Sequence, residues 1–195
     1  MGDPNPDYRA GLGTTLSFKG IALNVLFETS QGGDMWAGTY GVLNHFGVSA
    51  SSANEVTPSA DIVSYDGTVN PAGTLVRGNI TNFGAGDVLM DQSWYTSLGG
   101  GFGPIGEQYV FDASYIRLRE VSLSYSFPKS IIEKLKLTNL NLTLIGRNLA
   151  LWSDFADKFG VDPETNLTGV SNGRGLDYFN NPSTKSYLVK LTVAF

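Results

Sequence analysis

YRAGLGTTLSFKGIALNVLFE, residues 8–28, is the stretch that decides the fold of this 195-residue chain. From Tyr8 to Phe18 apolar and polar residues alternate with a period of two, and a second alternation begins at Ile21. Only Lys19 and Gly20 separate the two. Alternation of this kind is typical of a strand with one apolar face, and a short connection that contains glycine is typical of a hairpin. The stretch therefore predicts antiparallel strands at about 8–18 and 21–29.

Three later segments have the same alternation, and we expect strands at about 113–127, 138–151 and 184–195. In the segment 113–127 the apolar positions change from even numbers to odd numbers after Leu118. An extra residue would explain this change, so we predict a β-bulge near Arg119–Glu120. Pro128 should end the strand, and a short helical turn is expected within residues 130–137.

The connections between the strands alternate in length. Two are short, whereas the loops at about 30–112 and 152–183 are long. Compact soluble domains rarely contain unstructured loops of this length. Outer-membrane barrels have short periplasmic turns and long extracellular loops. Aromatic residues also lie near the strand ends, as they do at membrane interfaces. We therefore predict an all-β fold made of antiparallel transmembrane barrel strands with two long extracellular loops.

The predicted strands cannot close a barrel by themselves. The smallest membrane barrels have about eight strands, and an open edge in lipid leaves backbone groups unpaired. The start of the chain has no basic segment followed by an apolar segment, as a signal peptide would have. We therefore expect the chain to be a piece of a longer barrel whose remaining strands are supplied from elsewhere.

Composition excludes several other classes of function. The chain has no cysteine, which excludes disulfides, thiolate metal sites and a cysteine nucleophile. Its formal net charge of -5 argues against binding to nucleic acid, because phosphate binding needs clustered Lys and Arg. No apolar run is long enough for a membrane helix. We expect no cofactor and no metal site.

Five motifs, in order along the chain, resemble those of the SusC/RagA-type TonB-dependent transporters. They are the opening GDPNPDYRAGLGTTLSFKGIALNVLFE, the stretch FDASYIRLREVSLSYSFP, the segment IGRNLALWSDF, the loop VDPETN at residues 161–166, and the ending PSTKSYLVKLTVAF. Gly32-Gly33-Asp34 also follows the family pattern. The motifs extend from Gly2 to Phe195, and residues 35–109 are the least diagnostic part.

The resemblance implies a fold and a function. The family forms barrels of about 22 strands that enclose an N-terminal plug. Its members import glycans or peptides across the outer membrane with energy from TonB, and a SusD-like surface lipoprotein caps the barrel. Residues 1–195 would then be the C-terminal part of such a barrel, in the outer membrane of a Gram-negative bacterium, with the plug domain absent. Its partners would be the rest of the barrel, the plug, the lipoprotein, TonB and lipid, and it would not be an enzyme.

The last strand has a second predicted role. Its apolar positions end in an aromatic residue, which resembles the signal that barrel-assembly machinery reads. Such a signal works by strand addition at an exposed edge. The alternative, compatible with the first, is that Phe195 anchors the strand at the membrane interface. The residues of the predicted signal are Tyr187, Val189, Leu191, Val193 and Phe195.

Two features resemble sites for chemistry but are better explained otherwise. Residues 101–106 match the pattern G-x-G-x-x-G, yet Pro104 interrupts it and strand rather than helix is expected next. We interpret it as a surface loop. His45, the only histidine, lies in a Gly/Asn-containing stretch and is expected in a solvated loop rather than as a catalytic base.

Four acidic residues, Asp154, Asp157, Asp162 and Glu164, cluster in the second long loop. Paired carboxylates suit glycoside hydrolysis or calcium binding. The spacing of an EF-hand is absent, so a solvated acidic loop is the favoured interpretation.

The aromatic residues of the long loops offer sugar platforms or contacts to a capping protein, and packing within a folded loop explains them equally well. We therefore assign no substrate site. These residues are Trp36, Tyr40, Trp94, Tyr95, Tyr109 and Tyr178.

A secreted or surface β-sandwich that binds carbohydrate is the main alternative to a barrel. It would bury its apolar strand faces against each other in a water-soluble monomer. A glycan-cleaving enzyme built on the loop carboxylates is a remote third hypothesis.

Overall fold

The protein consists of two compact units, each assembled from separate stretches of the sequence. The structure is a computed structural model, and it describes residues 2–168 and 173–195. One unit, here called the strand unit, comprises residues 5–33, 112–164 and 181–195. The other, the loop unit, comprises residues 1–4, 34–111 and 165–180.

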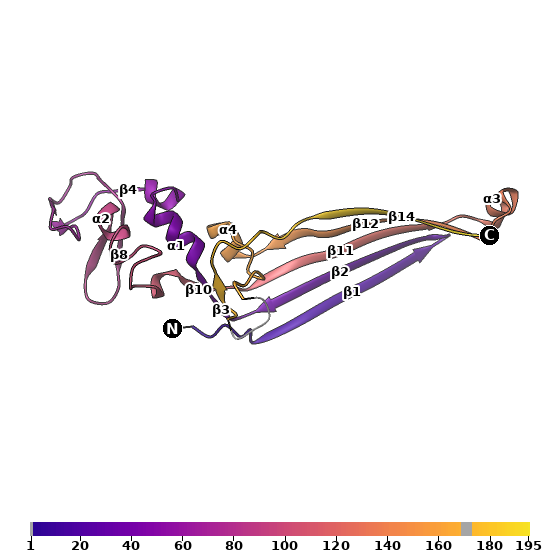
Figure 1. The fold of residues 1–195 in the computed structure, drawn as a ribbon, viewed down its shortest axis with the longest axis horizontal. Helices are drawn as coiled ribbons and strands as arrows, with labels where there is room; N and C mark the ends of the chain where they lie inside the picture. The colour runs from indigo at the N-terminus through magenta and orange to yellow at the C-terminus, as the bar shows by residue number, and fades with distance from the viewer. Residues whose placement is uncertain (1, 169–172) are drawn as a thin grey trace. The chain divides into compact units, whose positions relative to one another are not determined.

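The strand unit is built on a five-stranded sheet in the order β1-β2-β11-β12-β14, in which every neighbouring pair is antiparallel (Figure 1). The strands have between 9 and 14 residues, which is long enough to cross the hydrocarbon core of a membrane. Their ends lie within two residues of the predicted ends. They are β1 (Tyr8–Phe18), β2 (Ile21–Gln31), β11 (Tyr115–Ser126), β12 (Asn139–Trp152) and β14 (Ser186–Ala194).

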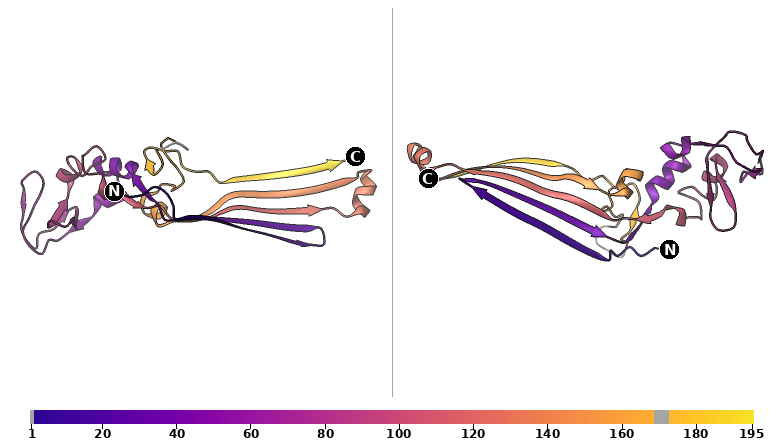
Figure 2. Two further views of the ribbon diagram at one scale, coloured as in Figure 1. Left: turned by 90° about the horizontal axis from the view of Figure 1, so that it is seen from below. Right: turned by 180° about the vertical axis from the view of Figure 1, so that it is seen from behind.

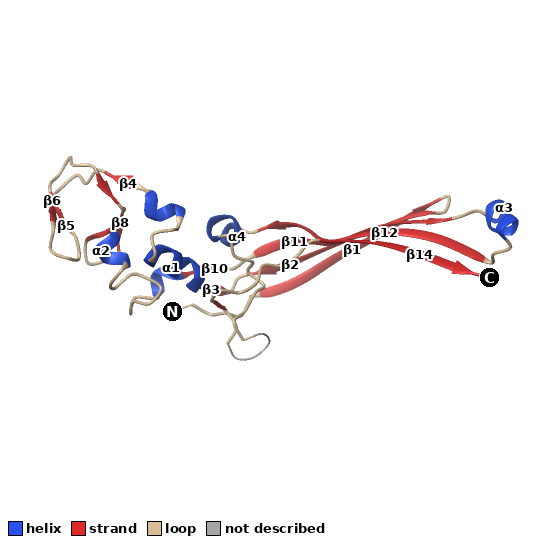
Figure 3. Cartoon of the chain, turned by 45° about the horizontal axis from the view of Figure 1, so that its top comes forward, coloured by secondary structure: helices blue, strands red, loops and turns tan. Residues whose placement is uncertain are grey.

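Short connections join the strands at one end of the sheet. Lys19 and Gly20 form the turn between β1 and β2, and both have positive φ angles, 45° and 85°. Between β11 and β12 lie a helical turn α3 (Lys129–Ile132) and a 3-10 turn η3 (Glu133–Leu135), where a short helical turn was expected (Figure 3). A further helix, α4 (Asp154–Phe159), follows β12 and was not predicted.

The bulge predicted in β11 is confirmed. Leu118 lies opposite Phe27 and Glu120 lies opposite Leu26, so Arg119 is an extra residue relative to β2. β12, the neighbour of β11 on the other side, has an irregularity at the same place. There the pairing moves from Leu118 opposite Ala150 to Glu120 opposite Arg147, and Asn148 adopts a positive φ of 52°.

One face of this sheet is apolar and exposed. Residues that are opposite each other in the ladders lie on the same face, so the register aligns apolar side chains in rows across all five strands. Leu16 and Val189, at the two ends of one row, are 62% and 72% exposed. The strands run side by side in each view of Figure 2. Two of the rows are Phe18, Ile21, Tyr125, Leu142 and Leu191, and Leu16, Leu23, Leu123, Leu144 and Val189.

The opposite face is polar, and its side chains are bonded across strands. Thr15 donates to Asn24 at 2.7 Å, and Asn24 donates to Ser122 at 3.1 Å. The hydroxyls of Ser124 and Thr143 lie 3.0 Å apart. The two faces of the sheet therefore suit two different solvents, one apolar and one aqueous.

The loop unit has its own small sheet, in the order β10-β3-β13. Its strands are β10 (Val110–Asp112), β3 (Asp34–Ala37) and β13 (Leu176–Asp177), and β3 pairs with β13 in parallel. The two ranges predicted as separate loops thus contribute to one folded unit. Residues 169–172 of the second range lie outside the described residues.

The remaining elements of the loop unit are short. Its helices are α1 (Gly38–His45), η1 (Ala50–Ala53), α2 (Gln92–Tyr95) and η2 (Glu107–Tyr109). Its strands form three two-stranded pairs, β4 (Glu55–Val56) with β7 (Val76–Arg77), β5 (Ile62–Val63) with β6 (Val69–Asn70), and β8 (Asn79–Asn82) with β9 (Asp87–Met90).

The core of the loop unit combines aliphatic residues with three buried aromatic residues, Trp94, Tyr95 and Tyr109. Glycines allow close packing around it. A Cβ atom on Gly101 would lie 2.4 Å from the Val42 nitrogen, and one on Gly103 would lie 2.2 Å from the Leu98 carbonyl oxygen. The glycine-rich stretch at residues 101–106 is therefore a packing feature.

No helix among the described residues is long and apolar enough to cross a membrane, a finding that does not address strands.

Candidate functional site

The bulge in β11 gathers charged residues on the polar face of the sheet. Arg117 lies opposite Glu28 of β2 in the ladder. Because Arg119 is the extra residue, it can point to the same face as Arg117 and Glu120 without breaking the alternation that follows. Its Nε atom lies 2.6 Å from Oε2 of Glu28. The bulge thus places three charged side chains of one strand on one face.

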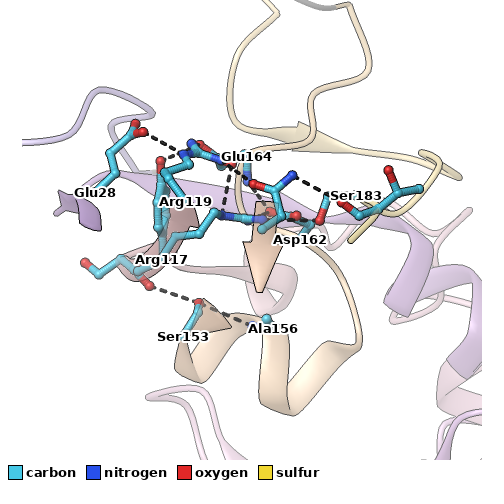
Figure 4. A network of polar contacts seen from close by, with 12 residues as sticks. Glu28, Arg117, Arg119, Ser153, Ala156, Asp162, Glu164 and Ser183 are labelled. Atoms are coloured by element: carbon cyan, nitrogen blue, oxygen red, sulfur yellow. Dashed lines mark hydrogen bonds and ion pairs between the residues drawn. The ribbon is translucent and has the colours of Figure 1, made fainter. Parts of the chain in front are cut away.

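Two further carboxylates pair with these arginines, and both come from the segment that follows α4. Arg117 Nη2 lies 2.6 Å from Asp162 Oδ1, and Arg117 Nε lies 3.1 Å from Glu164 Oε2 (Figure 4). Arg119 also forms an ion pair with Glu164 through Nη2. We call these five residues, Glu28, Arg117, Arg119, Asp162 and Glu164, the charge cluster.

Neutral groups complete the charge cluster. The Tyr115 hydroxyl donates to Glu164 Oε1 at 2.6 Å, and Arg117 Nη1 donates to the Ser183 hydroxyl at 3.2 Å. Arg119 Nη1 donates to Asn148 Oδ1 at 3.3 Å. Asn148 is the residue of β12 with positive φ, so the irregularities of both strands contribute to the same cluster.

Burial makes the central pair of this cluster interdependent. The side chains of Arg117 and Asp162 are only 2% and 6% exposed. A buried charge is costly unless it is paired and hydrogen-bonded. Burial by itself would raise the pKa of Asp162, but hydrogen bonds with Arg117 and Ser183 outweigh burial and hold that pKa below its ordinary value. Asp162 is therefore ionised at neutral pH.

The charge cluster is suited to positioning rather than to catalysis. Guanidinium groups do not release a proton at neutral pH, and carboxylates that already accept bonds from arginines are poor bases. Within the described ranges, no group of three or more His, Asp or Glu residues is arranged to hold a metal ion. The cluster instead fixes residues 162–164 against β11. It also joins two of the five motifs, because Arg117 belongs to one and Asp162 to another.

The expectation that the acidic residues form a solvated cluster is wrong for two of the four. Asp162 is buried and Glu164 is ion-paired. Asp154 and Asp157 lie in the first turn of α4, where a negative charge is favourable beside the helix N-terminus. Asp162 and Glu164 pair with arginine residues of β11, whereas Asp154 and Asp157 belong to α4, so the four acidic residues do not share one environment.

His45 does not lie in a solvated loop either, because it is the last residue of α1. Its ring packs edge-on against Phe46 and Phe102, with centroids 5.1 and 5.0 Å away. Its Nδ1 atom lies 3.1 Å from the Tyr95 carbonyl oxygen.

The loop aromatics divide between packing and partial exposure. Trp94, Tyr95 and Tyr109 are buried, so packing explains them. Trp36, Tyr40 and Tyr178 are partly exposed, and the rings of Trp36 and Tyr178 stack with centroids 6.1 Å apart.

The residues of the predicted assembly signal share the apolar face of the sheet. Tyr187, Val189, Leu191 and Val193 belong to β14, and Tyr187 is 77% exposed. Phe195 follows the strand and is 92% exposed. Their role in assembly stays a prediction.

Sequence reasoning did not single out Arg117 and Arg119. The available signal was an Arg-x-Arg pair within a strand whose other residues, apart from Glu120, are apolar or carry hydroxyl groups, together with an Asp-x-Glu pair in a distant loop. Charges at such positions are costly unless they find partners, and each pair is the natural partner of the other.

No protein-family model matches the chain. Among curated proteins it is 28% identical over 200 residues to TonB-dependent receptor P3 of Formosa agariphila, and 28% identical over 199 residues to TonB-dependent receptor P26 of the same organism. Both matches cover 100% of this chain but only 17% and 18% of the relatives. The chain resembles the C-terminal portion of TonB-dependent receptors. This chain therefore spans less than a fifth of the length of the relatives it matches.

Solved structures match the chain at the level of the fold. The RagAB peptide importer in its open-open state aligns with a TM-score of 0.61 and 18% identity over 98% of this chain, and over 17% of that chain. The closed-closed state gives a TM-score of 0.61 as well. The predicted resemblance to SusC/RagA-type transporters and the predicted fold, a part of a larger barrel, are confirmed. The relatives are named as receptors and importers, and none is named as an enzyme.

Proposed function

We propose that residues 1–195 form wall strands and extracellular loops of an outer-membrane TonB-dependent importer of glycans or peptides. In this proposal the chain performs no chemistry of its own. The apolar face of its sheet contacts lipid, and the polar face lines the lumen beside a plug domain. The two long connections lie outside the cell, where they contact substrate and a SusD-like lipoprotein.

The single observation that carries the proposal is the sheet with one exposed apolar face and two open edges. Rows of side chains in register across the five strands expose leucine, valine and aromatic residues. In water this surface would be an aggregation hazard, whereas in a bilayer it is the normal outer surface of a barrel. Within the described ranges the outer edges of β1 and β14 pair with no other strand. More barrel strands on both sides would satisfy them.

The proposed partners rest on the relatives. The chain is similar in fold to part of the RagAB peptide importer. This similarity supports a lipoprotein of the SusD type as a partner of this chain's parent protein. The name TonB-dependent receptor supports TonB as the energy source, reached through parts of the protein outside this chain.

A test of the proposal uses two neighbouring residues on opposite faces of β1. The chain has no cysteine, so Leu16→Cys and Ser17→Cys each introduce one reactive group into it. Both variants are made in the full-length protein, in a background without other cysteines, and are labelled with bimane in lipid vesicles. We expect doxyl-labelled lipids to quench the probe at position 16 and aqueous iodide to quench the probe at position 17. Equal quenching of both probes by iodide would overturn the proposal.

The β-sandwich alternative requires the apolar rows to be buried within the protein. Leu12 is 73% exposed and Leu16 is 62% exposed on this face, which does not favour a sandwich. The enzyme hypothesis has less support now that Asp162 and Glu164 are paired with arginine residues.

A further inference from the structure

The loop unit contains a cavity of about 850 Å³. Cavities that bind small molecules are typically about 300–1,000 Å³, with aromatic walls and a few well-placed polar groups. This cavity lies between α1, the β5–β6 hairpin and α2, and it is separate from the charge cluster, which belongs to the strand unit. No motif quoted from the sequence accounts for it.

One wall of the cavity is held by Asp91, which caps the N-terminus of α2. Its Oδ1 atom accepts from the Trp94 backbone N–H at 3.0 Å and from the Ser93 hydroxyl at 2.6 Å. Its Oδ2 atom accepts from the Ser64 hydroxyl at 2.5 Å, and Asn70 donates to that same hydroxyl at 2.9 Å. Asp91 is therefore occupied by the wall and is not available as a ligand for a cation.

His45 contributes a fixed ring to the cavity. Its Nδ1 atom lies 3.1 Å from the Tyr95 carbonyl oxygen, which can only accept, so Nδ1 carries the hydrogen. In the neutral ring Nε2 is then an acceptor. Because the ring also packs against Phe46 and Phe102, its orientation is set by the protein.

Other lining groups are free to bind a ligand. Tyr65 is 53% exposed and Phe46 is 66% exposed, so both present aromatic surface. In the described part of the chain, the hydroxyls of Tyr65 and Ser97 and the amide of Gln92 form no hydrogen bond with another protein group. These groups are neutral, and together they can donate and accept.

The charges of the lining nearly cancel. Apart from Asp91, the charged lining residues are Asp66 and Arg77. Asp66 already accepts from the Thr68 backbone N–H at 2.9 Å, and Arg77 donates through Nε to the Ser52 carbonyl oxygen at 3.0 Å. A strongly charged ligand would find little net opposite charge here. A ligand rich in hydroxyl groups, with apolar C–H faces for the exposed rings, matches the lining better.

We propose that this cavity binds a few residues of a neutral oligosaccharide outside the barrel. Tyr65 and Phe46 would pack against sugar rings, and Gln92, Ser97 and His45 Nε2 would bond to sugar hydroxyls. The inference rests on the proposed function for its setting, and it deepens that function by naming a neutral glycan as the substrate class.

The test uses the full-length receptor purified in detergent and saturation-transfer NMR. The probes are maltoheptaose, laminarihexaose and mannohexaose, each alone, and a mixture of random hexapeptides. Tyr65→Ala and Gln92→Ala remove free groups of the cavity, and Ser97→Trp fills its space without removing a bonded group. Leu75→Ala is the matched control, because Leu75 is 65% exposed in the same unit and does not line the cavity. Near-ultraviolet circular dichroism checks that each variant is folded.

We expect at least one oligosaccharide to bind, with affinity reduced at least fivefold in all three cavity variants and unchanged in Leu75→Ala. Binding of peptides alone, no binding of any oligosaccharide, or equal binding by the cavity variants and the control would each overturn the inference. The location of the same protein is measured separately by outer-membrane fractionation. A receptor that reaches the outer membrane but binds no sugar refutes the cavity and leaves the proposed function intact.

Discussion

At the scale of single residues, Arg117 is a charged residue whose side chain is almost completely buried. Its side chain is 2% exposed and lies within ion-pair distance of both Asp162 and Glu164. When one partner of a buried ion pair is removed, the remaining charge is left without compensation, at a cost of about 3–5 kcal/mol. The loss of stability should be greatest in the segment after α4, which carries Asp162 and Glu164.

Asp162→Asn is expected to loosen the segment 161–166 by about 3 kcal/mol, because Arg117 loses its closest carboxylate. This corresponds to a rise of roughly a hundredfold in local amide hydrogen exchange. The measurement is exchange followed by mass spectrometry on the full-length protein. Asp157→Asn is the control, since Asp157 is exposed in α4. Similar exchange in the two variants would contradict the role given to Asp162.

The same pair predicts a dependence on pH. The pKa of Asp162 is lowered in the folded protein from an ordinary value of 3.8, since its hydrogen bonds with Arg117 and Ser183 outweigh burial. A lowered pKa contributes stability that is complete above pH 3.8 and is lost as the pH falls through the folded-state value. Local exchange of residues 161–166, corrected for intrinsic rates, should be constant from pH 7 to about pH 4 and rise below it. Asp162→Asn should remove this dependence, and an unchanged rise in that variant would show that another group causes it.

At the scale of elements, the turn between β1 and β2 depends on backbone geometry rather than on side-chain contacts. Gly20 has a φ of 85°, and a Cβ atom there would lie 2.8 Å from the Ser126 carbonyl oxygen. A residue with a side chain is strained in this region of φ by roughly 1–2 kcal/mol. The hairpin therefore needs glycine at this one position.

Gly20→Ala should lower the free energy of unfolding by at least about 1 kcal/mol, measured by urea titration of the full-length protein refolded in lipid vesicles. Gly11→Ala is the matched control. Gly11 lies in β1, and a Cβ atom there would be 3.8 Å from its nearest neighbour, the Phe27 carbonyl oxygen. If the two glycine substitutions cost the same, the turn is not the reason for the loss.

The strands were predictable because each one has an apolar face and a polar face. Such a strand has a period of two in its sequence, and this period also revealed the bulge at Arg119, since a single extra residue exchanges the faces of all residues that follow.

The loop unit and the charge cluster leave no comparable pattern. The strands of the loop unit have two to four residues, too few for a periodicity. The ion pair of Arg117 and Asp162 joins residues 45 positions apart. Short elements and distant pairings are determined by the packed structure, so sequence alone placed the acidic residues in solvent.

At the scale of the whole molecule, β14 is the edge at which a barrel would be closed. Its apolar residues continue the rows of β12, and Phe195 follows it with 92% of its surface exposed. An exposed edge with alternating side chains can be recognised by strand addition, with main-chain bonds for affinity and side chains for specificity. This supports the proposed role of the strand in assembly.

Deleting Phe195 should reduce insertion of the full-length protein into the outer membrane severalfold, because the predicted assembly signal loses its aromatic side chain. Insertion is measured by the shift in gel mobility between heated and unheated membrane samples. Lys190→Ala, on the opposite face of β14, provides the control. Normal insertion without Phe195 would assign that residue to interfacial anchoring alone.

The parallel pairing of β3 with β13 sets an order for biogenesis. The Thr39 backbone N–H donates to Asp177 Oδ2, which lies 138 positions later in the chain, and β3 pairs with β13, so this pairing can form only when most of the sequence is available. Contacts between such distant positions form slowly. In the outer-membrane setting proposed above, the polypeptide would therefore cross the periplasm before β3 and β13 are paired.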